Sequence, residues 1–189
     1  MWTFRGIPCL YYGSEIEFKA GAPTDKGPAA PLESTGRAYF GDHIEGSVTA
    51  TDFGEWTNAS GAVAATLEKP LPKHLADLNK IRRAVPALQK GQYSNDGCNG
   101  NMSFKRRFTK NGVDSFVLVT ISGGATFSGI PGGTYVDVVT GDKKTVSEGG
   151  TLSASCSGSG NARIYVLQNQ TAKDYGADKK IAGKSQFLK

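Results

Sequence analysis

Seven short runs of β-branched and aromatic residues between Ser103 and Gln168 constrain this 189-residue chain more than any other feature. Turn signals separate the runs, among them Asn111–Gly112 and Thr140–Gly141–Asp142. Short strands at such spacing favour antiparallel sheets packed face to face. We therefore predict an all-β antiparallel sandwich, with strands at residues 103–109, 114–121, 125–128, 133–139, 143–147, 151–155 and 162–168.

An apolar stripe predicts one amphipathic helix before the strands. Its members recur at spacings of three and four residues, which is the period of a helix with one buried face. They are Leu71, Leu75, Leu78, Ile81, Val85 and Leu88. Pro72 suits a first helical turn, and Pro86 should end the regular helix near Val85.

The opening run Gly6–Tyr12 is apolar on both faces, as buried parallel strands are. One strand of this kind followed by one helix cannot cover both faces. We therefore expect this strand to have neighbours that the chain does not contain. Cys9 lies inside the run, so we expect a buried free thiol there.

The 22 Lys and Arg exceed the 17 Asp and Glu, which gives a formal charge of +5. The positive residues are scattered, apart from Lys105–Arg107 and the segment 169–189. We interpret the triplet as a strand with one solvated face and the segment as a loose basic tail or linker, not as a nucleic-acid surface. No apolar stretch approaches the roughly 18 residues of a membrane span, so we expect no membrane partner either.

Three cysteines leave an odd count without a zinc-type cluster. Cys98 and Cys156 both lie in loops rich in Gly, Ser and Asn. They could form a disulfide if the protein is exported and would remain free thiols otherwise.

The segment Arg5–Glu15, RGIPCLYYGSE, resembles the GxPxxYYGxE signature at the last barrel strand of α-amylases of glycoside hydrolase family thirteen. Leu78–Gly91, LNKIRRAVPALQKG, is similar to the last barrel helix of that family, with its paired arginines and xPAL ending. The predicted sandwich resembles the family's C-terminal β domain. The resemblance implies the terminal βα unit of a (β/α)8 barrel over residues 1–90, a Greek-key sandwich over 91–168 and a tail over 169–189.

The family hydrolyses internal α-1,4 bonds of starch with retention, so the resemblance implies a secreted, extracellular parent enzyme that acts on α-glucans. The family's catalytic Asp, Glu and Asp follow the fourth, fifth and seventh barrel strands, whereas this sequence begins at the eighth. We therefore expect no catalytic residue, no cofactor and no activity in this chain alone. Calcium, which the family often binds, would belong to the intact parent.

Glu15 and Glu17 could share one face of an extended chain at roughly 6–7 Å, which is marginal for a catalytic carboxyl pair. Neither has an evident device to raise its pKa, so we do not expect them to be catalytic. Glu15 could position loops or contact an outer substrate subsite. Arg37, Tyr39 and Trp56, in the long segment that follows, could line that subsite or form a small core of their own.

The alternative from another class is a free-standing carbohydrate-binding or interaction module. It would need exposed aromatic rings on one sheet face. Tyr135 and Tyr165 are the candidates, but both lie in apolar strands, which favours core packing.

Overall fold

The computed structural model describes residues 1–11, 14–16, 27–29, 47–52 and 55–189. These residues divide into two units. The first comprises Met1–Ile7 and Asp77–Lys189, and the second comprises Pro8–Ala76. Helix α3 (Pro70–Ala84) begins in the second unit and ends in the first.

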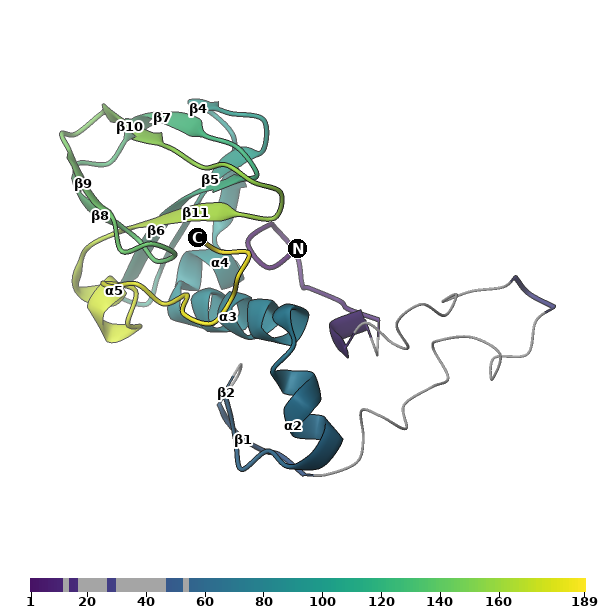
Figure 1. Ribbon diagram of the computed structural model, residues 1–189. Helices are drawn as coiled ribbons and strands as arrows, with labels where there is room; N and C mark the ends of the chain where they lie inside the picture. Colours follow the sequence, from purple (N-terminus) through teal and green to yellow (C-terminus); the bar gives the residue numbers. More distant parts are fainter. Residues whose placement is uncertain (12–13, 17–26, 30–46, 53–54) are drawn as a thin grey trace. The chain divides into compact units, whose positions relative to one another are not determined.

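The first unit is a β-sandwich-like domain made mostly of antiparallel sheets, with few helices (Figure 1). Its strands are β3 (Gln92–Ser94), β4 (Cys98–Asn99), β5 (Ser103–Lys110), β6 (Val113–Ile121), β7 (Ala125–Ile130), β8 (Gly133–Asp137), β9 (Lys143–Val146), β10 (Gly150–Ala154) and β11 (Ala162–Leu167). They form a six-stranded sheet in the order β3-β5-β6-β11-β8-β9 and a three-stranded sheet in the order β10-β7-β4.

All seven predicted strands are confirmed as β5 to β11, with ends that differ by one or two residues. The predicted helix is also confirmed, since α3 ends at Ala84 and α4 (Pro86–Lys90) begins at the proline that interrupts it. The sequence pattern missed β3 and β4, which lie in the Gly- and Asn-rich segment between the helix and the first predicted strand.

Alternation along the strands builds two cores, one on each face of the six-stranded sheet. Between the sheets lies an inter-sheet core of Phe116, Leu118, Ala125, Phe127, Ile130, Tyr135, Leu152, Ala154, Tyr165 and Leu167. On the opposite face, α3, α4 and the C-terminal segment cover a helix-side core that contains Phe104, Val117, Val119, Ile164, Val166 and Leu88. Figure 1 shows this succession of small sheet, large sheet and helices.

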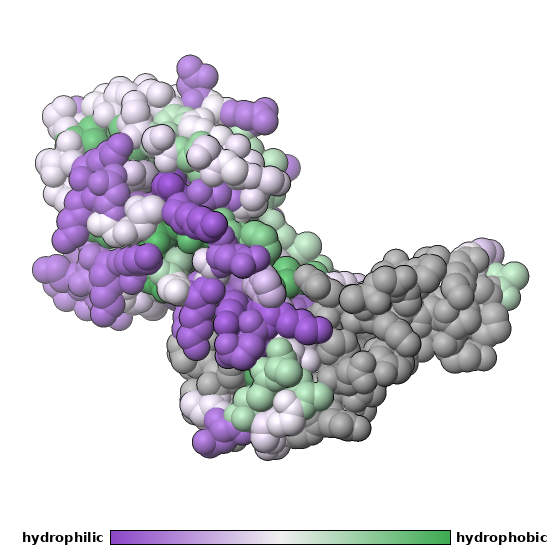
Figure 2. Space-filling view, viewed as in Figure 1, coloured by the Kyte–Doolittle hydropathy of each residue, from purple (hydrophilic) through white to green (hydrophobic). Residues whose placement is uncertain are grey.

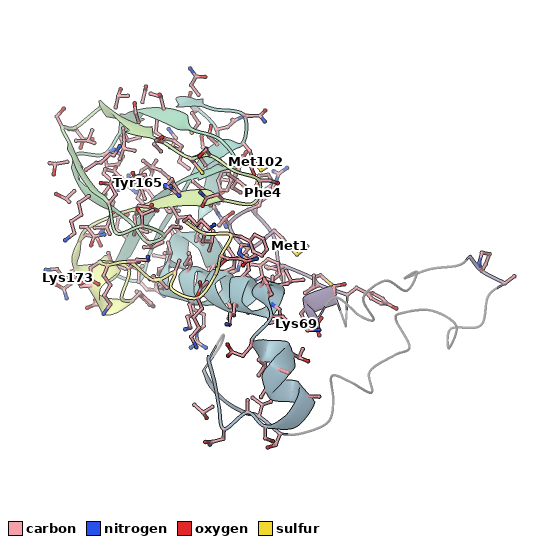
Figure 3. All side chains as sticks on the ribbon, in the orientation of Figure 1. Met1, Phe4, Lys69, Met102, Tyr165 and Lys173 are labelled. Carbon is pink, nitrogen blue, oxygen red and sulfur yellow. The ribbon has the colours of Figure 1, made fainter. Side chains whose placement is uncertain are left out.

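Strand β6 lies at the centre of this arrangement, and its residues 115–120 are all buried. A strand covered on both faces needs an apolar run without alternation, and Phe116–Val119 supplies one. Tyr135 and Tyr165, which we expected in the core, are 0% and 3% exposed. Figure 3 labels Tyr165 among the strands.

The expected loose tail is wrong, because the C-terminal segment is packed against the first unit. Helix α5 (Gln170–Asp174) begins it, and Ala177, Ala182 and Leu188 enter the helix-side core. The N–H groups of Ile181 and Ala182 both donate to Val138 O, at 2.7 and 3.1 Å. The segment packs because three apolar side chains are buried and backbone hydrogen bonds form. Its lysines remain at the surface, so this packing does not cost them their hydration.

By contacts, residues 77–90 and 169–189 belong to one unit with the strands. In the view of Figure 2, the surface near α3 and α5 is largely hydrophilic.

Among the described residues, no helix is both long enough and apolar enough for a membrane crossing.

The opening segment is not a strand in residues 1–11, contrary to our expectation. Cys9 is exposed and not buried. In residues 2–6, four backbone carbonyls accept hydrogen bonds from arginine side chains and not from a neighbouring strand.

In the second unit, η1 (Ser14–Ile16) is a single 3-10 turn, and β1 (Thr49–Asp52) pairs antiparallel with β2 (Glu55–Thr57). Helix α2 (Gly61–Leu67) follows, and Ser60 at its start shares hydrogen bonds with Ser47.

Candidate functional site

Of the four residues proposed for an outer subsite, only Glu15 has a described side chain, so the described residues show no such subsite. Glu15 lies in η1 and is partly exposed. Trp56 lies in β2, but its side chain is outside the described part of the chain, as are Arg37, Tyr39 and Glu17.

Cys98 and Cys156 do not form the suggested disulfide, because both are free thiols. Cys98 lies on β4 and pairs across to Phe127 of β7, whereas Cys156 follows the end of β10 on the other side of β7. A whole strand between the two chain segments exceeds the Cα separation that a disulfide can bridge. Burial raises the pKa of both thiols, so neither is an activated nucleophile.

The best-defined polar arrangement in the first unit is an arginine clamp, formed by Arg82 of α3 and Arg106 of β5, on the opening segment. Arg82 Nη1 and Nη2 donate to Trp2 O and Gly6 O at 2.6 and 2.9 Å. Arg106 Nη1 donates to Phe4 O at 2.9 Å, and more weakly to Thr3 O at 3.4 Å. Four backbone carbonyls of residues 2–6 thus accept hydrogen bonds from arginine side chains. In a β-strand, such carbonyls would accept from the backbone N–H groups of a neighbouring strand.

Arg106 also connects the clamp to the domain. It donates to Leu88 O at 2.5 Å and, through Nη2, to Gly91 O at 3.0 Å, where α4 ends and β3 begins. Within the described residues, every hydrogen bond that we find from the Arg82 and Arg106 side chains goes to a carbonyl. Burial lowers the pKa of both groups, and the nearby charge of Arg82 lowers that of Arg106 further. The carbonyl dipoles that Arg106 contacts offset part of the cost of burying its charge.

Three apolar side chains of the opening segment are exposed, whereas Thr3 is buried and Trp2 is half-buried. Met1, Phe4 and Ile7 of the first unit are 59%, 38% and 93% exposed. Phe4 is the partial exception, because its ring meets those of Tyr93 and Phe104 edge-on at 5.1 and 5.4 Å. Figure 3 labels Met1 and Phe4 in this region. The clamp therefore holds the backbone of residues 2–6, while Met1 and Ile7 beside it leave apolar side chains exposed.

Described residues of the first unit line a pocket between the sheets and another at the β5–β6 hairpin. One, of about 380 Å³, opens where the two sheets diverge beside β3 and β5. The other, of about 330 Å³, lies at the end of the β5–β6 hairpin, between Lys90, Phe108, Lys110 and Tyr175.

The basic triplet does not form a continuous cationic surface. Arg106 points to the helix-side core, whereas Arg107 forms a two-bond pair with Asp114 at 3.0 and 3.1 Å. This inward turn of Arg106 was missed from the sequence. Its position between Phe104 and Phe108, with period two, was the signal that could have revealed it.

Comparisons with family models, with curated proteins and with solved structures find no match to this chain. Among the described residues, no group of three or more His, Cys, Asp or Glu side chains could hold a metal ion.

Proposed function

We propose that this chain is the C-terminal part of a secreted α-amylase of glycoside hydrolase family thirteen, an extracellular enzyme that cleaves internal α-1,4 bonds of starch with retention. The observation that carries the proposal is the state of the opening segment. The GxPxxYYGxE pattern begins at Gly6, where the clamp on residues 2–6 ends, and the run Gly6–Tyr12 is apolar on both faces. Residues 1–11 lie outside any strand, and Ile7 is exposed. This is the behaviour expected of a barrel strand without its neighbours.

The order of elements supports the same proposal. An amphipathic helix with paired arginines and a PAL ending precedes an antiparallel sandwich-like domain. In the proposal, residues 1–90 are the last βα unit of the (β/α)8 barrel and residues 91–168 are the C-terminal Greek-key domain. The arginine clamp would join the two through Arg82 and Arg106.

The proposal assigns no catalytic residue to this chain, since the Asp, Glu and Asp of the family would lie upstream. Glu15, Arg37, Tyr39 and Trp56 are proposed as contacts to an outer part of the α-glucan chain. Any calcium would be held by the upstream part of the enzyme.

The alternative of a free-standing module that binds sugars through Tyr135 and Tyr165 loses its structural basis. Both rings are buried, and both hydroxyls are already engaged, with Pro131 O and Asp142 Oδ2 at 2.7 Å each. Neither ring can stack on a sugar.

The test compares this chain with a longer protein that includes its upstream coding region. We expect the 189-residue chain to release no oligosaccharide from soluble starch and the longer protein to release maltooligosaccharides. Starch hydrolysis by the pure chain, or a longer protein without the Asp, Glu and Asp behind successive strands, would overturn the proposal.

A further inference from the structure

The pocket at the end of the β5–β6 hairpin has three walls, which come from different parts of the first unit. Helix α4 supplies one wall, the hairpin supplies the second, and Tyr175, the C-cap residue of α5, supplies the third. Its volume of about 330 Å³ falls within the range of small-molecule sites, roughly 300–1,000 Å³.

Hydrogen bonds attach both helices to the strand that carries the hairpin wall. Ala87 N of α4 donates to Ser115 Oγ of β6 at 3.2 Å. At the start of α5, Asn169 Nδ2 donates to Asp114 O of β6 at 2.6 Å. The walls are therefore held by the folded domain, and a ligand would not have to order them.

Alternation along β5 brings a lysine to the same face as an aromatic ring. Phe108 packs against the helix-side core, so Lys110, two residues further along the strand, points to that face as well. Val113 is directly opposite Lys110 in the register of the hairpin and lies on the same face. The hairpin wall thus combines two apolar side chains with one ammonium group.

The lining carries two positive charges. Lys90 of α4 and Lys110 of β5 are both exposed, and within the described residues neither ammonium has an ion pair or a hydrogen bond. The Lys90 ammonium lies over the Phe108 ring, at 5.9 Å from its centroid. Among the described residues that line this pocket there is no Asp or Glu. Two cations beside one pocket without a carboxylate attract an anion.

The charges next to the pocket along the chain do not change this balance. Asp114 follows Val113 and therefore lies on the opposite face of the hairpin, where it pairs with Arg107 at 3.0 Å. Lys173 and Asp174, which precede Tyr175, carry opposite charges. The anion-binding charge therefore comes from the two lining lysines.

The remaining lining suits a flat apolar group with polar atoms at its edge. Pro86 is buried beneath the pocket, and Val113 and Phe108 are half-buried. The Tyr175 ring is 45% exposed, so one of its faces is open to a ligand. The Asn111 amide, at the hairpin turn, supplies a further donor.

We propose that this pocket binds a small organic phosphate, a phosphate monoester carried on a flat apolar group. Such a phosphate has a charge of roughly −1.5 to −2 at pH 7, which matches two ammonium groups. Lysine binds phosphate as a point charge, whereas a planar carboxylate is better matched by the fork of an arginine. Lys90, Lys110 and Asn111 contact the phosphate oxygens, and the apolar group lies against Phe108 and Tyr175.

This inference goes beyond the proposed function, because it requires neither starch nor an upstream enzyme. The experiment titrates the 189-residue chain with phenyl phosphate at low ionic strength and follows the backbone amide signals by NMR. We expect the signals of Gln89, Lys90, Lys110 and Asn111 to move together with one saturating dissociation constant. Inorganic phosphate and phenol, each of which fills only part of the pocket, should both bind more weakly than phenyl phosphate.

A substitution tests the role of the charge. In Lys110→Met, which keeps the apolar stem but loses the ammonium, we expect the affinity for phenyl phosphate to fall by about fivefold. The matched control is Lys143→Met, an exposed lysine on β9 at the far edge of the same sheet. We expect no change in the control.

Three outcomes would overturn the inference. They are no shift at the four amides with phenyl phosphate, equal loss of affinity in Lys110→Met and Lys143→Met, or inorganic phosphate or phenol binding as tightly as phenyl phosphate. The wild-type titrations decide the question even if Lys110→Met is poorly folded. An inactive longer protein with intact phenyl phosphate binding would count against the proposed amylase and leave this inference standing.

Discussion

Two neighbouring arginines on β5 have opposite roles because successive side chains of a strand point to opposite faces. Arg106 is 3% exposed and bonded to backbone carbonyls of two segments, whereas Arg107 pairs with Asp114 near the surface. The same residue type is therefore a buried connector at one position and a solvent-facing ion pair at the next.

We predict that Arg106→Ala lowers the free energy of unfolding by about 2–4 kcal/mol, because it removes the donor to the buried carbonyl of Leu88 and to the part-buried carbonyl of Phe4. Arg107→Ala is the matched control and should cost less than about 1 kcal/mol, as exposed ion pairs do. Urea unfolding measures both. Equal losses in the two variants would contradict the assigned burial.

Tyr165 links stability to alkaline pH. Burial, and then the hydrogen bond to Asp142, raise the pKa of its hydroxyl. The folded state keeps this proton while the unfolded chain loses it near pH 10, so above about pH 10 the unfolded state binds fewer protons and the free energy of unfolding falls as pH rises. The contribution is fully present below that pH.

We therefore expect Tyr165→Phe to lose stability at neutral pH, by about 1 kcal/mol for the hydrogen bond, and to show a shallower fall above about pH 10. Tyr175→Phe is the control, since that ring is 45% exposed, and its profile should match the wild type. Unfolding free energies from urea titrations between pH 7 and 11 are the measurement. An unchanged slope in Tyr165→Phe would refute the linkage.

At the scale of elements, helix α3 and the C-terminal segment are joined by one carboxylate. Asp77, 1% exposed, accepts from the N–H groups of Gly183, Lys184 and Ser185 with its Oδ2, at 3.1, 3.0 and 2.7 Å. The end of the chain is held in addition by Asn161, which donates to Lys189 O and accepts from Lys189 N.

We predict that Asp77→Ala costs about 2–3 kcal/mol of stability, because three charge-assisted hydrogen bonds to a buried carboxylate are lost. Hydrogen exchange should become faster at the amides of residues 183–185. The exposed Asp174→Ala serves as the control, and unchanged exchange at 183–185 in Asp77→Ala would rule out this attachment.

At the scale of the whole molecule, the proposed function makes one stability prediction that does not depend on activity. Ile7 is 93% exposed in this chain, so Ile7→Ser should change its stability by less than about 0.5 kcal/mol. In the longer protein, the proposed barrel would bury this side chain between strands and helices. The same substitution should then lower the free energy of unfolding by about 2–5 kcal/mol.

Urea unfolding of both proteins, with and without the substitution, tests this. Ile164→Ser, fully buried in the domain, is the control that should destabilise both. A small effect of Ile7→Ser in the longer protein would argue against a covered barrel strand, whatever its activity.

The strands and the main helix could be predicted because their patterns are local. The runs from Ser103 to Gln168 and the stripe from Leu71 to Leu88 repeat with the period of the element that they form. Of the proposed subsite, only Glu15 has a described side chain, so that part of the prediction remains untested by geometry.

The sequence by itself determined that β5 to β11 and α3 form, with ends correct to one or two residues, and that Tyr135 and Tyr165 face a core, since periodicity along an element carries this information. Only the tertiary structure decided that Arg106 bonds to the opening segment, that β7 separates Cys98 from Cys156, and that Ala177, Ala182 and Leu188 enter the helix-side core. These features depend on contacts between segments far apart in sequence, where no periodic pattern marks the partners. The positions of the irregular segments depend on hydrogen bonds to buried charged groups, such as Arg106 and Asp77.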